Sequence, residues 1–220
     1  MPGTAAEVLK KTRSELAPEA NANPLVPLVA SGRASRETFA ALALEQHRVI
    51  PADRRAFLHL AQRAVEEPAA AGFFTMLAEG EEQAAERLGA FTEACDVDDE
   101  RRQAYEPLPG CQAYPAYISW LALNADPTDA LLAVTANFAT WGTYCATIAH
   151  ALREHYGFTD EACAFFDFFA APAPALDEQA EAAVQAGLES GRLDEKRVYT
   201  YGRLLQAYEE MFWTSLRTLT

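Results

Sequence analysis

The chain has 220 residues, half of them hydrophobic, and its 32 acidic and 18 basic side chains give a formal net charge of −14. This length suits one domain, 1–220, with a core large enough to enclose a cavity. The charge repels a phosphate backbone and the basic residues form no patch, so we expect no direct nucleic-acid binding. No apolar run is long enough for a membrane span or a secretion signal, which favours a cytoplasmic protein.

The four cysteines, Cys95, Cys111, Cys145 and Cys163, follow no metal-binding spacing. They form no C-x-x-C pair and have no close histidine, so the sequence indicates neither a zinc site nor a disulfide framework. We interpret them as small apolar side chains of the core. A single reactive thiol among them is the alternative that the sequence leaves open.

Apolar residues recur at intervals of three and four along most of the chain, and alternating strand patterns are weak throughout. The sequence therefore predicts an all-α bundle of about seven or eight helices. In order, we expect helices at 5–16, 36–67, 69–94, 111–125, 127–156, 161–172, 174–190 and 198–219, with a short turn of helix at 25–30 and a charged connector at 96–109. Pro51 is expected to kink or interrupt the second of these helices.

Several helix ends carry clear signals. Ser35, Asp126 and Asp194 are suited to accept the first free N–H groups of the helices that follow them. Asp126 also precedes a proline, which is favoured at the first helical position. Gly157 and Gly191 are typical of residues that end a helix in the left-handed conformation.

Glu209 interrupts the apolar stripe of the last predicted helix. It follows Leu205 by four residues and precedes Phe212 and Trp213 by three and four, so its carboxylate projects among aromatic side chains. A carboxylate there needs a partner or holds a proton. It is either an active-site acid or base in an aromatic pocket, or a flanking glutamate that reaches solvent or pairs with a buried arginine.

Two further helices carry polar residues on apolar faces. Asn137, Trp141 and Tyr144 follow one another by four and three residues, and such a line points at another helix or at a ligand. His47 lies at the inner edge of the helix 36–67. It is interpreted either as a second acid or base that titrates near neutral pH, or as a core-edge histidine bonded to a backbone carbonyl.

The helix 69–94 concentrates acids in its middle, at Glu79, Glu81, Glu82 and Glu86. Four carboxylates so close together raise the question of a metal cage. However, the Glu-x-x-His pair that one helix usually contributes to a di-iron site occurs nowhere in the chain. We therefore expect a solvated acidic face and no metal.

Three segments together suggest a known family. Tyr208-Glu209-x-x-Phe212-Trp213 resembles the C-terminal YExxFW signature of the TenA family, which includes the class II thiaminases of thiamine metabolism. Residues 44–47 are similar to its L-x-QDY helix, and residues 113–117 to its AYxxY segment. The last-helix motif is specific and the other two are weak, but their order and spacing match from about Asn23 to Thr220. The resemblance implies a haem oxygenase-like helical bundle around a central pocket, forming a dimer or tetramer.

The resemblance also implies roles for single residues. Glu209 matches the family's catalytic acid, which protonates the leaving amine or ring, and Tyr114 matches a tyrosine of the pyrimidine pocket. We expect the substrate pocket to be completed by Tyr117, Asn137, Trp141, Tyr144, Phe169 and Tyr208.

The departures from the family pattern are as informative as the matches. His47 stands where the family has an aspartate that holds the aminopyrimidine. Asn137, or Trp141 in a shifted register, stands where the family has its nucleophilic cysteine, and Cys145 lies one to two turns beyond. Because thiaminase chemistry requires an activated thiolate, we do not expect standard thiaminase activity.

The same superfamily includes PqqC and related di-iron oxidases. Residues 155–158 and 163–166 are similar to a helix of those proteins, but Phe169 stands where their first histidine ligand would be. We therefore expect no redox metal and no cofactor.

Three hypotheses remain open. The first is a divergent enzyme that binds, and hydrolyses or otherwise transforms, a small aminopyrimidine-like nitrogen heterocycle with Glu209 and His47 as acid and base. The second is a non-catalytic ligand-binding or regulatory protein on the same fold. The third is a PqqC-like or di-iron oxidase with altered ligands.

Overall fold

The computed structural model describes residues 3–19 and 22–219, which form ten helices and no strand. Eight helices have eleven or more residues and two are short, so the predicted all-α bundle of seven or eight helices is confirmed with small additions. The helices are α1 (Ala5–Glu15), α2 (Val26–Ala30), α3 (Arg36–Arg63), α4 (Pro68–Ala94), α5 (Asp99–Ala104), α6 (Pro109–Asn124), α7 (Pro127–Tyr156), α8 (Asp160–Ala170), α9 (Pro174–Ser190) and α10 (Glu195–Arg217). The short helix α5 lies in the predicted charged connector.

The predicted helix ends are confirmed. The side chains of Ser35, Asp126 and Asp194 each accept a hydrogen bond from a first-turn N–H, at 3.1, 3.0 and 3.2 Å. Gly157 and Gly191 end α7 and α9 with φ angles of 72° and 66°. Because a side chain is strained in this left-handed region, glycine is the residue that these positions favour.

Pro51 does not interrupt α3, so of the two effects predicted there, a kink or an interruption, the interruption is wrong. The helix runs from Arg36 to Arg63 with Pro51 inside it. Proline removes the N–H that would bond to the carbonyl of His47, but Pro51 lies at the exposed side of the helix, where that carbonyl's lost bond costs less than in the core. The buried stripe of α3 therefore continues in register beyond Pro51 and includes Asp53.

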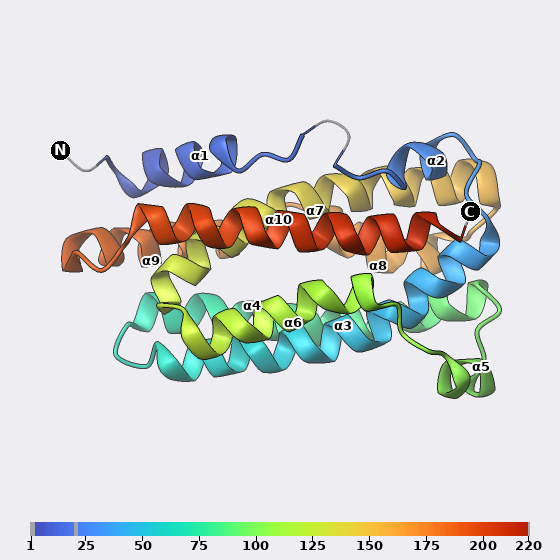
Figure 1. The fold of residues 1–220 in the computed structure, drawn as a ribbon, viewed down its shortest axis with the longest axis horizontal. Coiled ribbons are helices and arrows are strands. Elements are labelled where there is room, and N and C mark those ends of the chain that lie inside the picture. The colour runs from blue at the N-terminus through green and yellow to red at the C-terminus, as the bar shows by residue number, and fades with distance from the viewer. Residues whose placement is uncertain (1–2, 20–21, 220) are drawn as a thin grey trace.

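Helix α10 runs along the long axis of the molecule and organises the bundle (Figure 1). It packs against α6 on one side and α7 on the other, while α3 packs along α4. The start of α1 and the end of α10 lie at opposite ends of the long axis. This arrangement directs α3, α4, α6, α7 and α10 toward a common interior.

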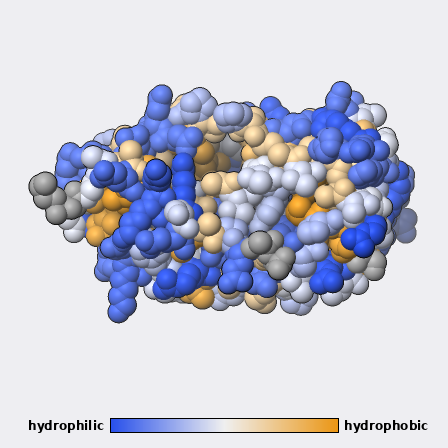
Figure 2. Space-filling view, turned by 90° about the horizontal axis from the view of Figure 1, so that it is seen from above, coloured by the Kyte–Doolittle hydropathy of each residue, from blue (hydrophilic) through white to orange (hydrophobic). Residues whose placement is uncertain are grey.

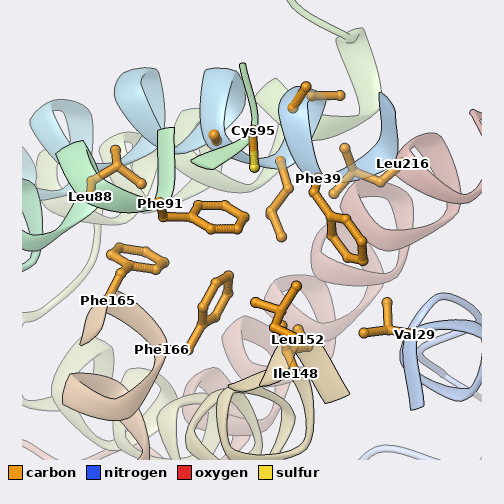
Figure 3. Close-up of a cluster of buried hydrophobic side chains, with 14 of the residues drawn as sticks. Val29, Phe39, Leu88, Phe91, Cys95, Ile148, Leu152, Phe165, Phe166 and Leu216 are labelled. Atoms are coloured by element: carbon orange, nitrogen blue, oxygen red, sulfur yellow. The ribbon is translucent and has the colours of Figure 1, made fainter. Parts of the chain in front are cut away.

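Aromatic side chains fill much of that interior. Figure 3 shows Phe91 of α4 meeting Phe165 and Phe166 of α8, with the Phe91 and Phe166 ring centroids 4.9 Å apart. A second cluster includes Phe57, Phe73 and other residues of α3, α4, α6, α7 and α9. All four cysteines are buried and free, as expected for core thiols.

Glu45 fixes the connector onto α3. Its side chain is fully buried, and its carboxylate accepts hydrogen bonds from the Tyr105 hydroxyl at 2.7 Å, the Leu108 N–H at 2.7 Å and the Gln112 amide at 2.6 Å. Three donors compensate for the loss of water around this charge. The start of α6, and with it Tyr114, is thereby positioned against α3.

The surface agrees with the acidic composition. Figure 2 shows hydrophilic residues over much of one face, with apolar residues in small groups between them. None of the helices in residues 3–19 and 22–219 combines the length and hydrophobicity needed to cross a membrane.

Candidate functional site

A cavity of about 50 Å³ lies where five long helices and the end of α8 converge. A single water needs roughly 10–15 Å³, so the cavity admits several waters or a small ring. Its lining combines aromatic and acidic side chains: Gln46, Val49 and Asp53 from α3, Glu81 from α4, Tyr114 from α6, Asn137, Phe138 and Trp141 from α7, Phe169 from α8, and Glu209 and Phe212 from α10.

Glu209 is held in the cavity by two hydrogen bonds. Its Oε2 accepts from the Asn137 amide at 2.6 Å and its Oε1 accepts from the Trp213 indole N–H at 3.1 Å. The Tyr114 hydroxyl donates to Asn137 Oδ1 at 3.4 Å, which assigns the orientation of the amide. The network joins α6, α7 and α10 and leaves each Glu209 oxygen able to accept a further bond.

The surroundings of Glu209 favour proton exchange. Burial raises the pKa of its carboxyl above the usual value, and the hydrogen bonds from Trp213 and Asn137 partly oppose that rise. A raised pKa brings a carboxyl closer to neutral pH, where it can both give and accept protons. Glu209 therefore has the surroundings of a general acid or base.

Asp53 and Glu81 place two more carboxyl groups at the same cavity. Their exposed fractions are 4% and 8%. Burial raises the pKa of both groups well above the usual values, and the charge of Asp53 raises that of Glu81 further. Two adjacent buried carboxyl groups cannot both ionise at low cost, so the pair retains a proton into a pH range where free carboxyl groups have lost theirs.

Tyr114 lies among all three acids. Burial raises the pKa of its hydroxyl, and the charges of Asp53, Glu209 and Glu81 raise it further. The hydroxyl therefore stays protonated and acts as a hydrogen-bond donor. The acids of α3, α4 and α10 are thus brought together around one phenol from α6.

Aromatic rings form the apolar walls. Trp141 packs edge-on to Phe169 with centroids 5.7 Å apart and stacks on Trp213 at 5.6 Å. Trp141 and Phe169 line the cavity, and the negative π faces of aromatic rings favour planar and cationic partners.

Five of the residues proposed from the sequence line this one cavity: Glu209, Tyr114, Asn137, Trp141 and Phe169. The other three aromatic residues do not line it. Tyr117 and Tyr208 pack against each other with centroids 5.1 Å apart, and Tyr144 packs edge-on to Trp213 at 5.8 Å.

His47 also lies away from Glu209. Its Nε2 is 3.0 Å from Thr92 Oγ1, and because the Thr92 hydroxyl donates to the Leu88 carbonyl at 2.8 Å, the histidine nitrogen is the donor. Burial and the nearby charge of Arg102 lower the pKa of His47. The structure thus places this histidine in a separate surface depression, and Gln46 faces the cavity instead.

Cys145 is buried and is not among the residues that line the cavity. Burial raises the pKa of its thiol well above the usual value, and the charge of Glu209 adds to that rise. Helix α7 is unbroken from Pro127 to Tyr156, so its register is not shifted toward the cavity. Cys145 therefore does not take the position of an activated thiolate.

Sequence reasoning missed Asp53 and assigned Glu81 wrongly to a solvated face. Glu79, Glu82 and Glu86 are exposed as expected, but Glu81 is buried. The signal was present, because Glu81 follows Leu77 by four residues and Asp53 follows Val49 by four, each within an apolar stripe. No group of three or more His, Cys, Asp or Glu residues in the described chain is arranged to hold a metal ion.

Comparisons with known proteins agree with the observed fold. Residues 19–219 match the model of the TENA/THI-4/PQQC family. The chain belongs to this family. A search of curated proteins gave no match.

Several solved structures have a fold similar to that of this chain. A TenA homologue from P. horikoshii OT3 is 16% identical, with a TM-score of 0.74, over 99% of this chain and 100% of that one. A TenA family transcription regulator from Silicibacter sp. TM1040 is 16% identical, with a TM-score of 0.70, over 96% and 95%. A domain of unknown function with a heme oxygenase-like fold from Shewanella denitrificans OS217 is 15% identical, with a TM-score of 0.68, over 97% and 89%. The haem oxygenase-like fold expected from the sequence is therefore confirmed.

Proposed function

We propose that this protein binds a small basic nitrogen heterocycle, similar to an aminopyrimidine, in the cavity, and that Glu209 exchanges a proton with the bound ring. The observation that carries the proposal is the Glu209 carboxylate, held by Asn137 and Trp213 inside an aromatic cavity. Family membership agrees with a TenA-like protein and leaves the ligand open.

The charge of the cavity supports a basic ligand. Among the described residues that line it, three are carboxylic acids and none is Lys, Arg or His. An amino group next to a ring nitrogen pairs with a carboxyl group through two parallel hydrogen bonds, one in each direction when the carboxyl is protonated. Burial raises the pKa of Glu209, which favours the protonated carboxyl that this pairing uses.

The lining also limits the chemistry. The resemblance to TenA aligns Asn137 with the family's nucleophilic cysteine, and an amide is no nucleophile. Support is therefore strongest for proton transfer by Glu209 without a covalent enzyme intermediate. The same asparagine favours a second candidate function, a protein that binds the heterocycle without turning it over.

Binding is tested by calorimetry with 4-aminopyrimidine and the variants Glu209→Gln and Glu210→Gln. Glu210 is the matched control, because it is the next residue of α10 and is exposed. Loss of a charge-assisted hydrogen bond costs about 1.5–3 kcal/mol, so Glu209→Gln should weaken binding by about tenfold or more. Equal affinities of the two variants, or no binding to the unmodified protein, would contradict the proposal.

Turnover is tested separately by mass spectrometry on a panel of aminopyrimidines. If Glu209 is catalytic, the unmodified protein and Glu210→Gln form product while Glu209→Gln does not. Binding of these compounds with no product from any variant would select the binding protein over the enzyme.

A further inference from the structure

A surface depression of about 340 Å³ lies where α3 meets α5 and the connector that follows it. Its lining consists of Leu44, His47 and Arg48 from α3, Arg102 from α5, and Tyr105, which ends α5. Two of these residues are arginines, one is a histidine and none is acidic. In a chain with a formal net charge of −14, the fold thus brings basic side chains from two distant segments into one hollow.

The Arg48 guanidinium is oriented by the protein but is not paired with an acid. Its Nη2 donates to the Tyr105 carbonyl at 3.3 Å, and no carboxylate of residues 3–19 and 22–219 forms an ion pair with it. The carboxylate of Glu45 is nearby on α3, but it already accepts hydrogen bonds from Tyr105, Leu108 and Gln112. A guanidinium has five N–H donors, so most of those of Arg48 are available to a ligand.

Arg102 adds a second positive charge to the depression. It pairs with Asp99, which precedes it by three residues on α5. The Asp99 side chain is 81% exposed, and exposed ion pairs of this kind contribute little. Burial lowers the pKa of His47, and the charge of Arg102 lowers it further. The positive charge of Arg102 therefore acts on the depression in spite of Asp99.

We propose that this depression binds a phosphate group between the guanidinium groups of Arg48 and Arg102. A phosphate monoester carries a charge of about −1.5 to −2 at neutral pH and three strong acceptor oxygens. It can therefore accept hydrogen bonds from guanidinium groups of two different helices, whereas the two oxygens of a carboxylate are satisfied by a single guanidinium. The site is separate from the cavity around Glu209 and does not rest on the function proposed there.

The size of the depression favours a phosphate that is part of a small organic molecule. Sites for small molecules have volumes of roughly 300–1,000 Å³, and this depression lies in that range. The overall negative charge of the protein opposes an anion, but at physiological ionic strength charges are screened beyond about 8 Å. Contacts at hydrogen-bond distance from Arg48 and Arg102 then decide the affinity, and binding should weaken as salt is added.

The test is calorimetry at neutral pH and low salt with glycerol 3-phosphate, inorganic phosphate and acetate. We expect both phosphates to bind the unmodified protein more tightly than acetate. Arg48→Gln and Arg102→Gln should each weaken phosphate binding by about tenfold or more, because each removes charge-assisted hydrogen bonds. Arg55→Gln is the matched control and should leave the affinity unchanged, because Arg55 is an exposed arginine of α3 that does not line the depression.

The outcomes decide both the site and the source of the phosphate. Tighter binding of glycerol 3-phosphate than of inorganic phosphate would identify an organic phosphate as the ligand, and the reverse order would identify the free ion; either order supports the site. Failure of both phosphates to bind, or acetate binding as tightly as they do, overturns the inference. Equal losses in Arg48→Gln and Arg55→Gln also overturn it, because they would reflect net charge alone. Both arginines of the site are exposed, so both variants should fold, and either one carries the test if the other does not.

Discussion

Replacing Asp53 by Asn should change how stability depends on pH. Burial raises the native pKa of Asp53 and of Glu81, so between the unfolded pKa of about 4 and the native pKa the folded state holds a proton that the unfolded state has lost. Stability therefore falls as pH rises through this window, by about 1.4 kcal/mol per pH unit for each retained proton. This fall ends where the pH passes the native pKa, so its extent measures how far burial raises that pKa.

Asp53→Asn removes one of these groups and also the charge that raises the pKa of Glu81. The variant should therefore lose less stability than the unmodified protein as pH rises. Urea unfolding at pH 5, 6, 7 and 8 measures this, with Glu79→Gln as the exposed control on α4. Parallel curves that differ only by a constant offset would refute the reasoning. The offset would then reflect packing alone, and the carboxyl group would carry no extra proton in the folded state.

Three further substitutions test the placement of other residues. His47→Ala should leave the affinity for 4-aminopyrimidine unchanged in calorimetry, because His47 lies outside the cavity. A tenfold loss of affinity would contradict this placement. Glu45→Ala leaves three half-buried donors without their acceptor and should lower the free energy of unfolding by about 2–4 kcal/mol in urea. A loss below about 0.5 kcal/mol would contradict the role of Glu45 in fixing the connector. Gly110→Ala places a methyl group 2.9 Å from the Met211 carbonyl and should cost about 1–3 kcal/mol, whereas Gly89→Ala meets nothing within 4 Å and should be neutral or stabilising; equal melting temperatures of these two variants would be inconsistent with the close contact of α6 and α10.

The sequence was sufficient for the helices because their signals are local. Intervals of three and four between apolar residues and the caps at Ser35, Asp126 and Asp194 act within a few residues of chain. Pro51 shows where local reasoning fails. A proline weakens a helix on its own, but α3 packs along α4 over its length, and tertiary packing maintains it.

The site was predictable only in part. Glu209 stands out because a charge interrupts a stripe within a specific motif. Asp53 follows Val49 by four residues, but Pro51 lies between them, and a kink or interruption there leaves the relation of the two side chains open. His47 was favoured over Gln46 on a weak motif, and neighbouring residues on a helix point about 100° apart, so a shift of one residue moves a side chain out of the cavity. Homo-oligomer formation and a cytoplasmic location stay predictions.

The sequence alone does not predict which side chains contact each other between helices. Asn137 was expected to point at a helix or a ligand, and it does bond to a helix, through Glu209. Which group it meets depends on how α7 and α10 are rotated against each other, and no local pattern specifies that rotation. The three tyrosines Tyr117, Tyr144 and Tyr208 illustrate the same limit, since helical spacing identifies a buried face but not which part of it borders a cavity.

A crystal structure with 4-aminopyrimidine would show whether the cavity binds the ring through Glu209. We predict the ring in the cavity, with its amino group and ring nitrogen within hydrogen-bond distance of the Glu209 carboxyl and its face against Trp141 or Phe169. A ring bound elsewhere on the protein, with the Glu209 carboxyl still contacted only by Asn137 and Trp213, would contradict it.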